Sequence, residues 1–296
     1  MNRADAPVPL ARRGGNAAAG TYAERFPEAK ARLLERLNRE RQAAGAAPVA
    51  YDLLGASVGD AFCVDAAMSR SSGHWDTAGR PPYLRWALAG GVDYHSENFS
   101  SLTRTGGAVE ESEVSRLLLD AHGQMMAERP PDDGHRRTVL DPEWTHVGIG
   151  AAVAGGEFRM VEEYSRRVAL WVEVPRAPVP ARGRAPFAVK LPAGWALVAL
   201  EVGFEPAPRP MSLEEIRRRS SYAYPAASQR LLARAPVYNQ YPDGSRGEVD
   251  LVRGVARANI PLLSGPGNYY VFVFAAPGSH EGRSLSPLTA ALIQAQ

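Results

Sequence analysis

Apolar positions repeat at helical spacing in the first part of the chain and alternate further along it. The helical pattern covers residues 27–45, 51–71, 82–91 and 108–128. In the first of these segments Leu33, Leu34 and Leu37 form one apolar face, and Gly45 is a suitable C-terminal stop. Apolar side chains alternate over residues 145–153 and, less regularly, over 157–165, which predicts two strands. Helices that come before strands favour an α+β domain over a repeated βαβ unit.

The second part of the chain has a different pattern. Residues 173–186 are rich in proline and are expected to form a linker, because proline stiffens a chain and cannot join a central sheet. β-Rich runs separated by Gly/Pro turns follow, which is typical of a small Ig-like β-sandwich. Ser212 and Glu215 have capping-box spacing and predict a helical insert. The predicted organisation is a lead-in (1–22), an α+β domain (23–172), a linker and a sandwich domain (187–296).

Composition excludes several classes of protein. The 296 residues are 45% hydrophobic and 22% charged, with a net charge of +2, so nucleic acid is not expected as a partner. No apolar run reaches the roughly 20 residues of a membrane-spanning helix. The first twenty residues lack the apolar core of a secretory signal. Cys63 is the one cysteine, so no intrachain disulfide is expected, and its apolar setting predicts a buried core residue.

Polar side chains that could carry chemistry gather in short segments between the predicted helices. The stretch 93–99, DYHSENF, holds a histidine, a glutamate and an asparagine together. His74 and His135 each follow a predicted helix, so both are free to reach a shared cleft. The chain has neither H-E-x-x-H nor C-x-x-C nor G-x-S-x-G spacing, so any site must be assembled from distant segments.

Five motifs in order resemble those of the CAP superfamily, which groups cysteine-rich secretory proteins, antigen 5 and pathogenesis-related proteins (the SCP domain). The matching positions are Asn38 and Arg41, His74, Glu97 and Asn98, Gly134 to Arg136, and the strand EWTHVGIG. The similarity covers about residues 30–164. The absence of the disulfides found in eukaryotic members indicates a bacterial type.

This resemblance implies an α-β-α sandwich with a central antiparallel sheet. It also implies a cleft in which His74 and His135 bind a divalent cation, zinc first, with magnesium or calcium as alternatives. Glu97 is expected beside them, and Asn98 is expected to hold a turn. Asp120, with Glu113 behind it, is the expected second acid. His95 and His122 are expected at the surface or behind the ligands.

Three functions stay open. The first is a secreted, periplasmic or cell-envelope binding module that recognises a cell-wall or other extracellular partner. The second is a peptidase-like metal-dependent hydrolase with Glu97 as general base and Asp120 in the site, although two protein ligands are fewer than the three usual for catalytic zinc. The third is lipid or sterol capture in a groove lined by Leu118, Met125 and Met126.

Overall fold

The computed structural model describes residues 23–219, 221–278 and 286–296, and the predicted lead-in 1–22 lies outside them. The helices are α1 (Pro27–Ala43), α2 (Leu53–Ser69), α3 (Pro82–Leu88), α4 (Val114–Ala127), α5 (Gly134–Leu140) and α6 (Leu213–Arg218), with a 3-10 turn η1 (Glu111–Glu113). The first six strands are β1 (Ala50–Tyr51), β2 (Tyr94–Thr103), β3 (His146–Ala154), β4 (Glu157–Arg166), β5 (Leu170–Glu173) and β6 (Arg184–Lys190). The others are β7 (Trp195–Glu205), β8 (Ala227–Leu231), β9 (Asp250–Val252), β10 (Val255–Pro261), β11 (Gly267–Pro277) and β12 (Thr289–Ala295).

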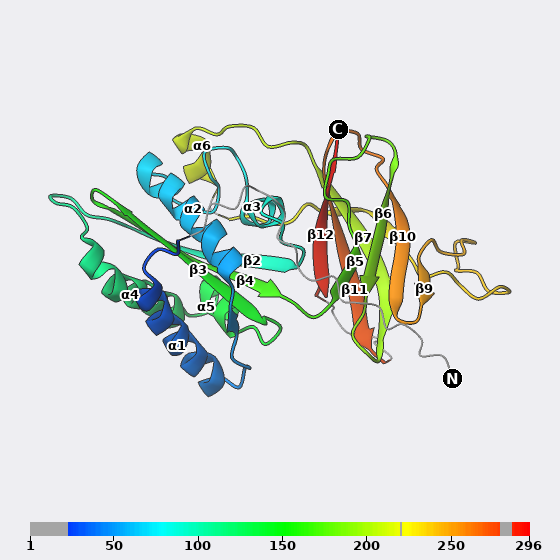
Figure 1. The fold of residues 1–296 in the computed structure, drawn as a ribbon, viewed down its shortest axis with the longest axis horizontal. Coiled ribbons are helices and arrows are strands. Elements are labelled where there is room, and N and C mark those ends of the chain that lie inside the picture. The colour runs from blue at the N-terminus through cyan, green and yellow to red at the C-terminus, as the bar shows by residue number, and fades with distance from the viewer. Residues whose placement is uncertain (1–22, 220, 279–285) are drawn as a thin grey trace.

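The first domain has three layers. Its sheet has the order β1-β3-β4-β2, antiparallel except for the parallel β1–β3 pair. Figure 1 shows α2 on one face of this sheet and α1, α4 and α5 on the other. On the second face, Leu33 and Leu117 pack with Ile149 in one core, while Phe62 and Cys63 pack with Val161 on the α2 face. The predicted α+β class, its α-β-α order and the buried Cys63 are therefore confirmed.

Glycines let α2 approach the sheet closely. A Cβ atom on Gly148 would lie 2.3 Å from the backbone of Gly55, and one on Gly150 would lie 2.2 Å from the backbone of Gly59. Real Cβ atoms do not come this near to another backbone, so the helix packs here backbone against backbone.

A buried ion pair links all three layers. Nζ of Lys30 in α1 lies 2.9 and 2.8 Å from the two carboxylate oxygens of Asp60 in α2. The same carboxylate accepts a hydrogen bond from the N–H of Ala151 in β3. Lys30 is 1% exposed, and an ammonium group at that depth requires such a partner.

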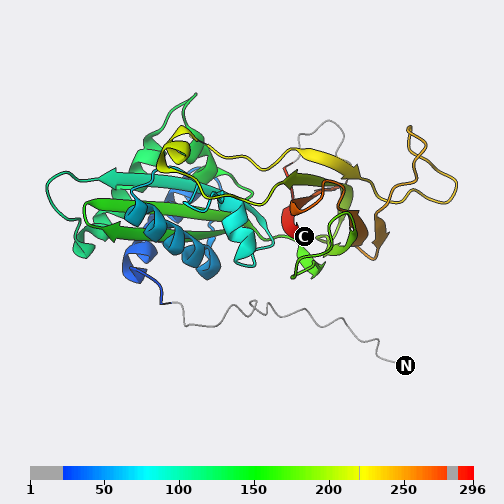
Figure 2. The ribbon, with the colours of Figure 1, turned by 90° about the horizontal axis from the view of Figure 1, so that it is seen from above.

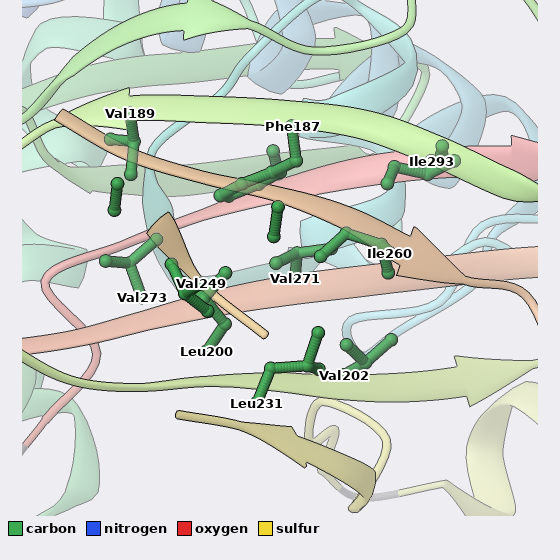
Figure 3. Close-up of a cluster of buried hydrophobic side chains, with 14 of the residues drawn as sticks. Phe187, Val189, Leu200, Val202, Leu231, Val249, Ile260, Val271, Val273 and Ile293 are labelled. Atoms are coloured by element: carbon green, nitrogen blue, oxygen red, sulfur yellow. The ribbon is translucent and has the colours of Figure 1, made fainter. Parts of the chain in front are cut away.

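The second domain is a β-sandwich of two four-stranded sheets, β5-β6-β10-β9 and β12-β11-β7-β8. Figure 3 shows Phe187 and Ile260 of one sheet and Val271 and Ile293 of the other pointing into a shared core. The domain begins earlier than expected, because β5 at Leu170–Glu173 already pairs with β6. Residues 173–186, predicted as a linker, lie within the sandwich, where Val179 bridges to Ala295.

An aromatic interface joins the two domains. Tyr83 and Leu84 of α3 pack against Tyr270 and Phe272 of β11. The hydroxyls of Tyr83 and Tyr270 donate to the two oxygens of Glu205, at 3.0 and 2.6 Å. Burial raises the pKa of Glu205 against the effect of these two donors. The interface between the domains is thus apolar, and the Glu205 carboxylate inside it has hydrogen-bond partners.

Candidate metal-binding cleft

The candidate site lies along the open edge of the first sheet. The resemblance implies a turn at Asn98 in the stretch 93–99, but residues 94–103 form the edge strand β2. Glu97 and Asn98 are consecutive in this strand, so their side chains point to opposite faces of the sheet. Side chains of this one edge strand therefore point toward both helical layers.

On the α2 face, Glu97 holds His74. Nδ1 of His74 lies 2.8 Å from Oε1 of Glu97, and the guanidinium of Arg85 in α3 donates to Oε2. Arg85 also donates to the carbonyl of His74 at 2.7 Å. The histidine is thus fixed through its ring and through its backbone by one carboxylate–guanidinium pair.

On the other face, Asn98 reaches the second histidine. Its Nδ2 donates to the carbonyl of His135 in α5 at 3.1 Å and to Glu162 at 3.2 Å. Nδ1 of His135 lies 2.5 Å from Oε1 of Glu128, and the His135 N–H donates to Oε2 of the same carboxylate at 3.0 Å. Glu128, which directly follows α4, therefore orients His135 as Glu97 orients His74.

Both histidines open into one cleft of about 680 Å³. Its lining consists of His74, Tyr94, His95, Ser96, Glu97, Asn98, Glu128, Asp132, Gly134, His135, Thr138, Ser221, Tyr222, Ala223 and Tyr224. The side chain of His74 is 12% exposed and that of His135 is 37% exposed, so a solute can reach both rings. Because Nδ1 of each ring faces a carboxylate, Nε2 is the atom that can bind a ligand.

The charges at Glu97 are arranged to keep it ionised. Burial alone would raise the pKa of Glu97, but Arg85 and His74 outweigh this effect and lower it. Glu163 is its cross-strand neighbour in β4, and burial together with the Glu97 carboxylate holds the Glu163 pKa well above its ordinary value. The pKa values of these two neighbouring carboxyls are therefore shifted in opposite directions, and Glu97 is the one whose charge is stabilised.

His95 lies beneath the cleft, stacked on Trp86 with ring centroids 5.1 Å apart. Its Nε2 lies 2.8 Å from Oε2 of Glu163, but neither ring nitrogen makes a hydrogen bond within the residues described. Burial lowers the pKa of His95 to about 3, so the ring is neutral. Of the two positions expected for His95, at the surface or behind the ligands, the surface position is wrong, because the residue is 1% exposed.

A second buried histidine connects the helical layer to the sheet. Nδ1 of His122 in α4 lies 2.6 Å from Glu162, and its Nε2 lies 2.7 Å from Glu40 of α1. Burial would lower the pKa of His122, but these two carboxylates raise it. In return, His122 outweighs the burial of Glu162 and lowers that carboxyl's pKa. His122 is fully buried and not at the surface.

Asp120 does not belong to this cleft. It lies on the outer face of α4, 54% exposed, in an ion pair with Arg116 at 2.7 Å. Glu113 pairs with Arg104 and Arg116 and does not line the cleft either. Asp120 precedes Glu128 by two helical turns, about 12 Å. The carboxylate placed beside the second histidine is Glu128.

The side chains proposed for a lipid groove lie elsewhere. Leu118 and Met125 are buried in the core between α4 and the sheet, and Met126 packs beside Leu37 and Val147. None of the three lines the cleft.

Two histidines of the cleft are the side chains whose chemistry suits a transition-metal ion. Among the residues described, no group of three or more His, Cys, Asp or Glu side chains is arranged to hold a metal ion. His74 and His135 are two suitable nitrogen donors, each backed by a carboxylate. Such backing is the usual arrangement of metal-binding histidines, since it fixes the tautomer and the ring orientation.

Two residues of the site are not predicted by any pattern in the sequence. Glu128 precedes His135 by seven residues across a proline-containing turn, and the chain reversal that joins them has no periodic signal. Tyr222 comes from the second domain, about 125 residues after Glu97. No local pattern in the sequence points to it.

Solved structures resemble the chain over about half of its length, whereas neither a protein-family model nor a curated protein matches it. An extracellular SCP-domain protein of Bacillus anthracis is 19% identical over 46% of this chain and 40% of its own, with a TM-score of 0.36. An outer surface protein of Borrelia burgdorferi is 12% identical over 48% of this chain and 94% of its own, with a TM-score of 0.37. Na-ASP-1 is 10% identical over 50% of this chain and 39% of its own, with a TM-score of 0.35.

These similarities concern the fold alone. The three layers of residues 27–166 themselves have the arrangement that the ordered motifs imply. The chain covers less than half of the Bacillus anthracis protein and of Na-ASP-1, so nothing about activity is carried over. Over the described ranges, no helix combines the length and apolar character needed to cross a membrane.

Proposed function

We propose that the chain is a CAP-type binding module whose cleft holds a divalent cation, zinc first, between His74 and His135. The observation that carries this proposal is the matched pair of histidine–carboxylate contacts, at 2.8 Å to Glu97 and 2.5 Å to Glu128. Each contact leaves Nε2 as the donor atom, and imidazole nitrogen suits zinc better than it suits magnesium or calcium.

A bound cation would supply a positive charge and a Lewis acid in the cleft, with waters in its remaining positions. The protein's own part is to orient the two rings and to keep Glu97 anionic. We further propose an extracellular or cell-envelope setting with a cell-wall or other extracellular partner. Two of the structural neighbours, an extracellular protein and an outer surface protein, support this setting.

Calorimetric titration of zinc into the metal-free full chain tests the cation site. His74→Ala and His135→Ala should each weaken binding by about tenfold or more, because removal of even an outer partner of a ligand costs about 10–100-fold. His146→Ala is the matched control, since His146 begins β3 and does not line the cleft. Equal affinity in all four proteins would contradict the proposal. Parallel titrations with magnesium and calcium decide which cation is preferred.

The geometry gives less support to a hydrolase that uses Glu97 as its base. The carboxylate is fully buried, contacts Arg85 and His74, and has a lowered pKa, whereas an effective base has a pKa near the working pH. Peptide and ester cleavage by wild type and Glu97→Gln separates the two functions. A wild-type rate well above that of the variant would favour the hydrolase.

A further inference from the structure

A segment of the β-sandwich domain crosses to the first domain and returns. Residues 206–226, here called the strap, connect β7 to β8 and carry α6. Figure 2 shows the strap leaving the sandwich, lying over the first domain at α6 and coming back. Strands β7 and β8 pair directly in the sandwich, so their pairing does not require this excursion.

The strap is anchored on the loop that holds His74, at residues directly after this histidine. The N–H of Met211 donates to the carbonyl of Thr77 at 3.0 Å. Further along, the indole N–H of Trp75 donates to the carbonyl of Ser221 at 3.3 Å, and the guanidinium of Arg219 lies 4.2 Å from the Trp75 ring. Ile216 of α6 is fully buried. The strap is therefore packed against the first domain as a fixed element.

Tyr222 of the strap meets the free edge of β2 at Glu97. Its hydroxyl accepts a hydrogen bond from the N–H of Glu97 and donates to the carbonyl of the same residue at 3.2 Å. The hydroxyl of Ser96, 3.1 Å away, completes the set as a second donor. A phenol has one proton and two acceptor positions, so this hydroxyl is fully satisfied. It binds the edge groups that a neighbouring strand would otherwise bind.

The same side chain contacts the histidine that Glu97 holds. The rings of Tyr222 and His74 meet edge to face, with centroids 4.7 Å apart. Burial and the Glu97 carboxylate raise the pKa of Tyr222, so the phenol keeps the proton that it donates. Tyr222 therefore touches the backbone of Glu97 and the ring of His74 at once.

We propose that Tyr222 is a positioning residue of the cleft, through which the β-sandwich domain fixes the Glu97–His74 pair. The cleft is then built by both domains. The first domain supplies the carboxylates and imidazoles, and the second supplies the hydroxyl that sets the backbone of Glu97. The consequence for zinc binding rests on the proposed function, whereas the positioning itself does not.

Tyr222→Phe tests this because it keeps the ring against His74 and removes only the hydroxyl. In the metal-free protein, hydrogen exchange of the Glu97 amide should become at least tenfold faster. The ¹⁵N shifts of the His74 ring, which report its tautomer, should move toward a mixture of both tautomers. Zinc affinity should fall by about tenfold. Tyr269→Phe removes a buried hydroxyl that donates to the Gly265 carbonyl within the sandwich, away from the cleft. It is the control and should leave all three measurements unchanged.

Two outcomes separate the proposals. If wild type binds no zinc but Tyr222→Phe still changes the exchange of Glu97 and the tautomer of His74, the proposed function fails and the positioning role stands. If Tyr222→Phe leaves amide exchange and ring shifts as in wild type, the positioning role is overturned, whatever the zinc affinity. Thermal unfolding checks that Tyr222→Phe keeps a wild-type-like fold. We expect both measurements to stay changed although the fold is retained.

Discussion

Oε1 of Glu128 lies 2.5 Å from Nδ1 of His135, and this contact has the same form as that of Glu97 with His74 on the opposite face of the sheet. The two histidines come from different helical layers, yet each presents the same ring nitrogen to a carboxylate. The similarity of the two contacts indicates that Glu128 orients the His135 ring, and this role can be measured.

Glu128→Gln should weaken zinc binding by about 10–100-fold, because the amide is a poorer acceptor for the His135 ring and leaves its tautomer less defined. Asp120→Asn is the control, since Asp120 lies outside the cleft in a surface pair with Arg116. Calorimetric titration of both variants checks this. An equal loss in the two would show that overall charge, and not the orientation of His135, is responsible.

The His122 network should make stability depend on pH in a defined direction. The pKa of His122 is raised in the folded state, so its contribution is complete below its ordinary value of 6.5 and is lost as pH rises through the raised value. Glu162 has a lowered pKa, so its contribution is present above 4.5 and is lost as pH falls through the lowered value. The network is therefore most stabilising between about pH 4.5 and 6.5.

His122→Gln should accordingly cost about 3 kcal/mol in free energy of unfolding near pH 6, since it leaves Glu162 buried without its cationic partner. The cost should become smaller as pH rises through the raised pKa of His122, because wild type then loses the charge as well. Urea unfolding over a series of pH values from 6 upward measures the change. A wild-type stability that does not fall relative to the variant on the alkaline side of pH 6.5 would contradict the raised pKa.

His95 should act in the opposite direction. Its folded pKa of about 3 lies below the ordinary 6.5, so its contribution is present above 6.5 and is lost as pH falls from 6.5 toward 3. His95→Phe keeps an aromatic ring on Trp86 and removes the titration. Between pH 6.5 and 4.5 the stability of the variant should fall less steeply than that of wild type, by at most about 1.4 kcal/mol per pH unit. Parallel slopes would count against a neutral buried His95.

The glycine contacts between α2 and the sheet should tolerate no side chain. Gly150→Ala would place its Cβ 2.2 Å from the backbone of Gly59, so α2 must move away from β3. We expect a loss of about 1–3 kcal/mol in free energy of unfolding, the usual cost of overpacking. Gly134→Ala is the control, because a Cβ there meets nothing within 4 Å. Thermal unfolding of both proteins checks the prediction, and equal midpoints would contradict it.

Most of the helices follow from local sequence signals. The helix pattern located α1 to α4, Asp52 caps α2 by accepting from the N–H of Leu54, and Ser212 and Glu215 form the predicted capping box. These features depend on residues close together in the chain. The ordered motifs also brought His74, Glu97 and His135 to one cleft.

The structural features that the sequence does not predict depend on contacts between distant segments. Strand β2 lacks apolar alternation because both of its faces meet buried polar networks, through Glu97 on one side and Asn98 on the other. Helix α5 has no apolar periodicity that would predict it, since its residues GHRRTVL have one fully buried position, Val139. Of the prolines in 173–186, Pro175, Pro178 and Pro180 lie between the paired strands β5 and β6, so they mark a connection inside one domain. Pro186 lies within β6 itself, opposite Asn259 of β10.

The burial of Lys30 against Asp60 has a practical consequence. The sequence has two lysines, and the other, Lys190, is exposed at the end of β6. Apart from the α-amino group, an amine-reactive dye should therefore modify the folded chain at one position, on the sandwich and away from the cleft. Appearance of a second labelled lysine would then report the opening of the three layers.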